Sequence, residues 1–211
     1  MVLTVDSVGA YLKSNRPIEP LVEQLRAEPD KADAILEAFV SSRSFDRRSW
    51  AVWAAPQLLP QDRAVALLTK LARSRDPDVS DDALFALLEF DRPAAMKLLP
   101  RIRRKLRSTD IYEPVAAMWM LARLDSGASQ EILEAAEESD YPFHRLVAEA
   151  VTLFIRRDTK EIARLIEVRG EEALHLVTAA ERLEDPELAR VVAEWRKKDE
   201  TGAARERRNP A

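Results

Sequence analysis

The chain of 211 residues carries 33 Lys and Arg against 37 Asp and Glu, which gives a formal net charge of −4. It contains no cysteine, which excludes disulfides, thiolate catalysis and cysteine-ligated metals, and its four glycines are too few for a glycine-rich phosphate loop. No stretch is long and apolar enough to span a membrane, and residues 1–15 lack the basic and apolar regions of a secretory signal, so we expect a cytoplasmic protein without membrane contact.

Apolar residues recur at helical spacing along almost the whole chain, whereas the alternation typical of strands is missing. Loops between the apolar runs are short, as in antiparallel helix pairs. Pro56 and Pro100 are expected to end or kink their helices. The pattern predicts helices roughly over residues 5–14, 17–27, 31–42, 46–57, 62–73, 78–90, 93–107, 112–124, 129–138, 143–156, 159–168, 171–183 and 186–198.

The helix pairs repeat. Four alanines, each inside an apolar helix, are spaced 32, 33 and 32 residues apart: Ala51, Ala83, Ala116 and Ala148. Such a period, with two helices in each repeat, is typical of an α-solenoid. We predict an all-α solenoid over residues 43–198, preceded by an N-terminal helical extension or cap over 1–42. Residues 199–211 lack large apolar side chains and are predicted to form a disordered tail.

One repeat carries a motif. The run Arg75-Asp-Pro-Asp-Val79 is followed by Ala83-Leu-Phe-Ala-Leu87, and it resembles the opening of HEAT repeats, in particular the short type found in phycobilin lyases. The resemblance covers roughly residues 43–195 and implies a right-handed superhelix of about five helical hairpins, whose second helices line a concave inner face. Ser80 stands where the family favours an arginine that forms a ladder with the aspartate.

Two of the predicted second helices carry opposite charge. Residues 92–107 include seven basic residues and no acid, and residues 125–140 include six acids and no base. Alignment of their core residues predicts that Lys97, Arg103 and Arg104 face Glu131, Glu137 and Glu138, respectively. These charges either form ion pairs between repeats or form a bipolar surface for a partner with acidic and basic ends.

Two tryptophans lie three residues apart on one predicted helix and join these charges as candidates for partner binding. Aromatic residues at helical spacing more often belong to the core, and we expect this of Trp119. The candidate partner-binding residues are Lys97, Arg101, Arg103, Arg104, Glu131, Glu134, Glu138, Trp50 and Trp53.

The sequence offers no constellation of catalytic residues. His144 and His175 are its only histidines, and both are predicted to be surface or rim residues. Glu172 and His175 have the spacing of two metal ligands on one helix face, but no second such pair exists, so we expect no metal and no cofactor. A serine or threonine nucleophile has no partnered histidine motif nearby.

The sequence therefore predicts a non-enzymatic protein–protein interaction module, a scaffold or adaptor that binds another protein on its concave surface. The alternative is a nucleic-acid-binding or DNA-repair-associated protein that uses the basic helix Arg101–Arg107 and the cluster of Arg43, Arg47 and Arg48. A third hypothesis, an enzyme accessory of the bilin-lyase type, depends on the resemblance alone.

Overall fold

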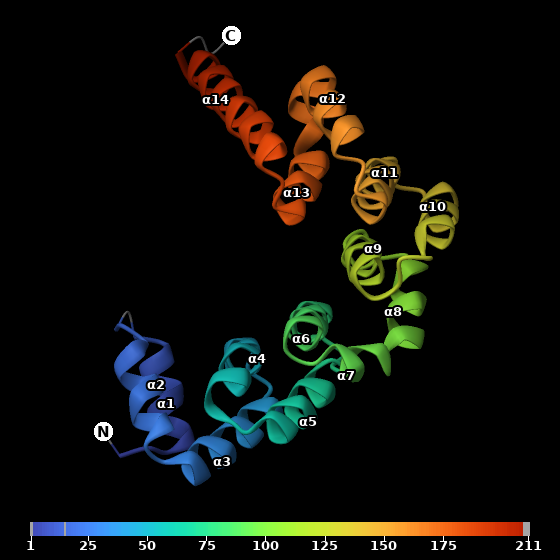
Figure 1. The fold of residues 1–211 in the computed structure, drawn as a ribbon. Coiled ribbons are helices and arrows are strands. Elements are labelled where there is room, and N and C mark those ends of the chain that lie inside the picture. Colours follow the sequence, from blue (N-terminus) through green and yellow to red (C-terminus); the bar gives the residue numbers. More distant parts are fainter. Residues whose placement is uncertain (1, 15, 209–211) are drawn as a thin grey trace. The chain divides into compact units, whose positions relative to one another are not determined.

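The computed structural model describes residues 2–14 and 16–208, and this part of the chain is all-α (Figure 1). It contains 14 α-helices and one short 3-10 helix. The helices are α1 (Val5–Leu12), α2 (Glu19–Arg26), α3 (Pro29–Val40), α4 (Phe45–Leu58), α5 (Gln61–Leu71), α6 (Pro77–Phe90), α7 (Arg92–Met96), α8 (Leu99–Leu106), α9 (Glu113–Leu124), α10 (Ser129–Glu137), α11 (Phe143–Arg156), α12 (Thr159–Arg169), η1 (Gly170–Ala173), α13 (Leu174–Leu183) and α14 (Pro186–Arg208).

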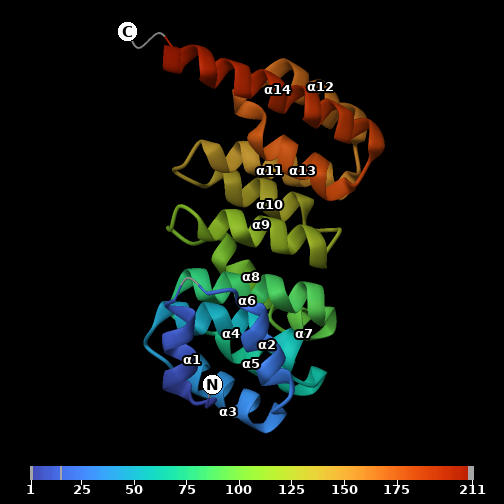
Figure 2. The ribbon, with the colours of Figure 1, turned by 90° about the vertical axis from the view of Figure 1, so that its left-hand side faces the viewer.

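The chain divides into two compact units, residues 1–99 and 100–211. In the first unit α3 packs against α4 and α5 against α6, and α4 also contacts α5 and α6 (Figure 2). Helix α2 contacts α3 and α4. The core between these helices includes Phe39, Leu36, Leu67 and Leu84, all fully buried. Neighbouring helices thus pack as sequential pairs, as the short loops predict.

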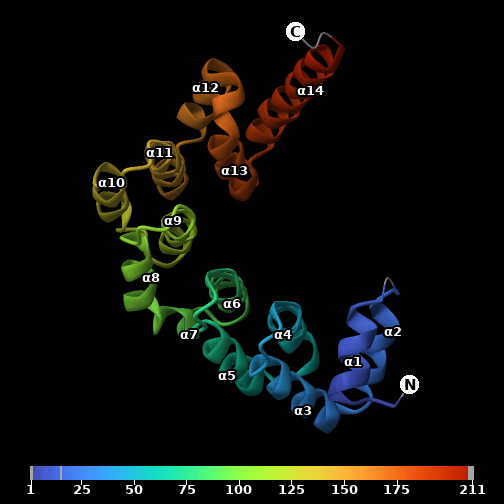
Figure 3. The same cartoon turned by 180° about the vertical axis from the view of Figure 1, so that it is seen from behind.

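The second unit is built in the same way. Helix α11 contacts α9, α10, α12 and α13, and α14 contacts α12 and α13 (Figure 3). Its core includes Ile102, Met118, Ile132, Val147 and Ile162, which are inaccessible to solvent. No helix in the described part of the chain has the length and apolar character required to cross a bilayer.

The motif residues lie where the first unit joins one helix pair to the next. The Asp76 side chain accepts a hydrogen bond from the Val79 backbone N–H and so caps α6. Ser80 is buried, and its hydroxyl donates to the Ala72 carbonyl over 2.9 Å. Arg48 of α4 reaches Asp76 with an Nη2–Oδ2 distance of 2.6 Å, so a charge-assisted bond joins α4 to the start of α6.

Both prolines act as predicted. Pro56 lies inside α4, which ends two residues later at Leu58. The predicted helix 93–107 is interrupted, because α7 ends at Met96 and α8 begins at Leu99, with Pro100 in its first turn. A proline has no backbone N–H to donate and clashes with the preceding turn, so it fits the start of α8 and is unfavourable in the body of a helix such as α4, which ends soon after it.

The C-terminal part of the chain differs from the prediction. Helix α14 continues to Arg208, in place of a disordered tail that starts at residue 199; residues 209–211 lie outside the described residues. The absence of large apolar side chains argues against a packed core here but not against a helix. Alanine, glutamate and arginine, which dominate residues 203–208, have high helix propensity.

Candidate functional site

Opposite charges meet on the second unit, between α8 and the segment that holds α10. Nε of Arg103 lies 2.9 Å from Oε2 of Glu131, and Nη2 of the same guanidinium lies 3.0 Å from Oδ2 of Asp125. Nε of Arg107 lies 3.9 Å from Oε2 of Glu138. Ion pairs between these helices therefore use much of the charge that the sequence places there.

The predicted register of these ion pairs is wrong. Arg103 contacts Asp125 and Glu131, not Glu137, and Glu138 is met by Arg107, not by Arg104. The prediction assumed one unbroken helix over 93–107 aligned with the acidic helix. The helix is broken before Leu99, so a register counted through residues 93–107 does not hold for α8.

The other charged candidates have separate environments. Lys97 directly follows α7 in the first unit and is exposed, and Arg104 is exposed on α8. Arg101 is half-buried on α8. Glu134 is exposed and accepts a hydrogen bond from the Gln130 side chain over 2.9 Å. The structure thus brings together Arg103 with Glu131 but does not gather the whole predicted set at one place.

A basic pocket of about 440 Å³ lies at the C-terminal end of α8 and is lined by Arg101, Arg104, Lys105, Arg107, Ser108, Thr109 and Glu113. Its one carboxylate is neutralised from within the protein. The buried Lys105 ammonium lies 2.6 Å from one Glu113 oxygen, and the Ser108 hydroxyl donates to the other over 2.7 Å. Burial raises the pKa of the Glu113 carboxyl, but the bonds from Lys105 and Ser108 outweigh it, so the pKa is lowered. Glu113 is therefore held as an ion.

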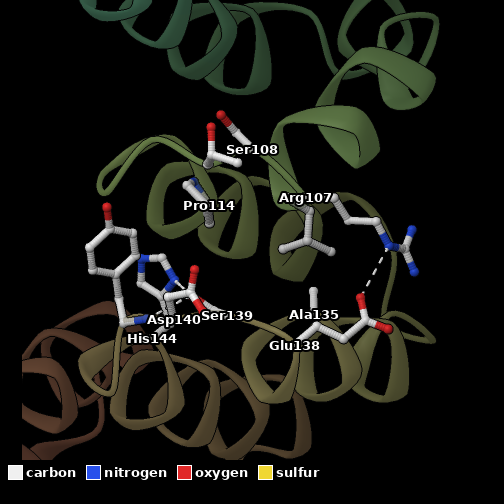
Figure 4. A pocket seen from close by; sticks show the side chains of 11 residues that line it. Arg107, Ser108, Pro114, Ala135, Glu138, Ser139, Asp140 and His144 are labelled. Atoms are coloured by element: carbon white, nitrogen blue, oxygen red, sulfur yellow. Dashed lines mark hydrogen bonds and ion pairs between the residues drawn. The ribbon is translucent and has the colours of Figure 1, made fainter.

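A second, polar pocket of about 310 Å³ lies beside the first, between the ends of α8 and α10 and the starts of α9 and α11. In Figure 4, His144, Ser139 and Asp140 gather on one side of this pocket, and Arg107 faces Glu138 on the other. Thr109 and Tyr141 add hydroxyl groups to its lining, and Pro114 and Ala135 add apolar surface.

His144 is not the surface or rim residue that the sequence predicts. Its side chain is 1% exposed, and both ring nitrogens are engaged: Nδ1 lies 2.6 Å from Oγ of Ser139, and Nε2 lies 2.8 Å from the carbonyl oxygen of Ile111. A carbonyl can only accept, so Nε2 carries a proton and donates it. In the neutral ring Nδ1 then accepts from Ser139.

The sequence pattern also gives no sign that Ser139 and His144 are hydrogen-bonded to each other. The Ser139 hydroxyl oxygen also accepts the Tyr141 backbone N–H over 3.1 Å. The pair therefore ties the loop before α11 to the loop before α9. His144 precedes Val147, Ala148 and Val151 by three, four and seven residues, so its place on an apolar helix face was the signal of burial that the prediction overlooked.

The tryptophans divide between core and surface. Trp119 is buried as predicted, packs edge-on against Phe154 at 5.7 Å between ring centroids and lies beneath the Arg182 guanidinium. Trp50 is half-buried against Phe39. Trp53 is 46% exposed, although its ring centroid is only 6.3 Å from that of Trp50.

Trp53 lines an apolar groove of about 440 Å³ between α4 and α6 in the first unit; the groove residues are Ser49, Val52, Trp53, Pro56, Asp82, Ala86, Glu89 and Phe90. Asp82, from α6, lies at its rim and has no ion-pair partner among the described residues. Close packing partly desolvates its carboxyl group, and this burial, together with the charge of Asp78, raises its pKa. The groove thus combines an exposed indole with a carboxylate whose charge is unfavourable in the isolated protein.

Sequence reasoning missed Asp82 as a member of this site. The sequence pattern gives Asp82 no binding role, and only the packing of α4 on α6 shows that it shares a groove with Trp53. The helix pattern itself contains a usable signal, because Asp82, Ala86 and Glu89 follow one another at helical spacing on one face.

No group of three or more His, Asp or Glu side chains in the described part of the chain is arranged to hold a metal ion. The side chain of Glu172, one half of the Glu-x-x-His pair, lies outside the described residues. His175 is half-buried, and burial lowers the pKa of its imidazole below the usual 6.5.

Comparison of the chain with known protein families, with curated proteins and with solved structures finds no match.

Proposed function

We propose that the protein is a non-enzymatic interaction module, a scaffold or adaptor, which binds a protein partner in the groove between α4 and α6. The observation that carries this proposal is the presence of the exposed Trp53 and the unpaired, partly desolvated Asp82 in one apolar groove. Large exposed aromatic side chains in concave sites are typical anchors of protein–protein interfaces.

The chemistry of the groove favours a partner segment with a basic side chain next to an apolar one. The alkyl stem of lysine or arginine covers apolar surface, and its charged end can bind a carboxylate. The cation is also attracted to the face of an indole ring. Such a side chain would satisfy Asp82 and contact Trp53 at the same time.

We further propose that the helix pairs form a HEAT-like solenoid. Arg48 supports this, because it precedes Ala51 by three residues as Ser80 precedes Ala83. It therefore occupies, one repeat earlier, the position at which the family favours an arginine, and it binds the motif aspartate Asp76. Ser80 cannot form the arginine–aspartate ladder of the family, but the ion pair between Arg48 of the preceding repeat and Asp76 is its equivalent.

The nucleic-acid alternative has less support. Arg48 binds Asp76, Arg103 binds two carboxylates, and Arg47 lies over the Phe39 ring with its Nη2 3.7 Å from Asp6. Side chains engaged in this way are less available to phosphates than the sequence alone suggests.

A displayed library of random peptides tests the proposed groove. We expect the wild-type protein to select peptides that contain a basic residue beside an apolar one. Trp53→Ala should lower the affinity for the selected peptides by about tenfold or more, as loss of an aromatic anchor does. Phe45→Ala is the matched control, because Phe45 is 45% exposed on the same helix but lies outside the groove. Equal losses with the two variants would overturn the proposal.

Asp82→Asn adds a second readout that a merely structural role cannot produce. It should lower the affinity for the selected peptides. It should also raise the free energy of unfolding at neutral pH, since it removes a partly desolvated charge that Asp78 repels. The gain should be below about 1 kcal/mol because solvent screens an exposed group. Chemical denaturation measures it, and a loss of stability would contradict the assignment.

A further inference from the structure

The basic pocket at the end of α8 is a second candidate site, in the other unit of the chain and independent of the groove. We infer that it binds a compact small molecule that carries a diphosphate or triphosphate group. The inference goes beyond the proposed partner binding and stands on the charge, the hydroxyl groups and the size of this pocket.

The lining of the pocket carries more basic than acidic side chains. It holds four basic side chains and one carboxylate. The carboxylate, Glu113, is already bound by Lys105 and by the Ser108 hydroxyl. The nearby Asp110 carboxyl accepts the backbone N–H groups of Glu113 and Tyr112 before and at the start of α9, and these bonds lower its pKa. Both acids therefore have partners of their own.

Arg104 and Arg107 present exposed guanidinium groups at the pocket, and the contact of Arg107 with Glu138 is long, at 3.9 Å. A guanidinium presents several donors in one plane and matches two oxygens of a phosphate at once. The Thr109 hydroxyl at the same wall adds a further donor. A volume of about 440 Å³ lies within the range of small-molecule sites.

The surroundings favour a compact anion over a nucleic-acid strand. The basic surface does not continue as a track, because Arg103 on the same helix is held by Asp125 and Glu131. Helix α10 presents the acidic Glu134, and Glu138 follows it next to Arg107. A polymer of phosphates that extended from the pocket in this direction would meet carboxylates, whereas a diphosphate fits within the basic wall.

Calorimetric titration with inorganic pyrophosphate tests the inference on the full chain. Arg104→Ala and Arg107→Ala should each lower the affinity about tenfold, the usual effect of one charge-assisted contact. Arg145→Ala is the matched control, because Arg145 is an exposed arginine of the same unit on α11 and lies outside the pocket. It should change the affinity less than about twofold. Lys105 is left in place, since its removal would leave the half-buried Glu113 without its cation.

Each outcome decides the question. Binding that falls in both pocket variants and not in Arg145→Ala supports the site. No binding in the millimolar range, or equal losses in all three variants, overturns it. If orthophosphate binds as tightly as pyrophosphate, the proposed preference for a diphosphate or triphosphate group is wrong. A single-stranded oligonucleotide that binds more tightly than pyrophosphate, with a steep dependence on salt, overturns the compact ligand in favour of nucleic acid.

Discussion

A single buried imidazole organises the loops around the polar pocket. His144 receives the Ser139 hydroxyl on one ring nitrogen and donates to the Ile111 carbonyl from the other, and its ring packs edge-on against Phe143 at 4.5 Å. No aliphatic side chain can satisfy these two polar groups. The residue therefore connects the loop before α11 to the loop before α9, and its Ile111 partner lies 33 positions earlier in the chain.

Replacing His144 should destabilise the protein strongly. We expect His144→Ala to lower the free energy of unfolding by about 2–4 kcal/mol, because it leaves a cavity and a buried carbonyl without its donor. Chemical denaturation measures the loss. The same change at the half-buried His175 should cost much less, and equal losses at the two positions would show that the hydrogen bonds of His144 contribute little.

His175 should make the stability depend on pH. Burial lowers the pKa of its imidazole in the folded chain below the 6.5 of the unfolded one, so the unfolded state binds the proton more tightly. The stability is thus highest above pH 6.5 and falls as the pH drops through and below this value. His175→Gln should flatten this part of the curve of unfolding free energy against pH, and an unchanged curve would contradict the assignment.

At the scale of the helices, ion pairs determine how neighbouring elements are joined. Arg48 and Asp76 connect α4 to α6, Arg103 connects α8 to α10, and the Arg169 guanidinium of α12 forms two hydrogen bonds with Glu149 of α11, 2.6 and 2.8 Å long. Each ion pair joins either two consecutive helices or two helices with one other helix between them in the sequence. Exposed pairs of this kind add little free energy, but they discriminate between alternative registers.

A double-mutant cycle tests the observed register. Arg103→Ala and Glu131→Ala should show a coupling free energy of about 0.2–1 kcal/mol, as partly exposed ion pairs do. Arg103→Ala and Glu137→Ala should show none, although the sequence pattern pairs these two residues. Unfolding free energies of the single and double variants measure both couplings. A larger coupling to Glu137 would restore the predicted register.

At the scale of the whole molecule, each of the two units has a core of its own. Leu36 is fully buried among the helices of the first unit, and Ile132 is fully buried in the second. In chains built from sequential helix pairs, most stabilising contacts are made between neighbouring helices. A mutation in one core therefore lowers mainly the stability of the helices around it.

Core truncation in one unit should therefore leave the other protected. Leu36→Ala should cost about 2–5 kcal/mol of local stability and speed the amide hydrogen exchange of α3 to α6. The amides of α9 to α13 should keep their wild-type rates, and Ile132→Ala should give the reverse pattern. Hydrogen exchange followed by mass spectrometry resolves the two regions. Loss of protection in both would show that the units unfold together.

The helical nature of the chain and most helix positions follow from sequence alone, because they depend on local physics. Apolar residues that recur about every 3.6 positions mark the buried helix faces, and Pro100 marks the break between α7 and α8. Asp91 and Asp185 accept backbone N–H groups at the starts of α7 and α14, since a cap needs only a backbone N–H a few residues away. The burial of Trp119 follows in the same way from its place on an apolar face.

The candidate sites depend on contacts between helices, which no local pattern contains. The carboxylates that meet Arg103 depend on how α8 packs beside the segment that holds α10, and the hydrogen bonds of His144 depend on a carbonyl from a preceding loop. Trp53 and Asp82 belong to different helices and form one groove only because α4 packs on α6. Helix formation is governed by neighbours in the chain, whereas a binding site is governed by neighbours in space, and only the tertiary structure specifies these.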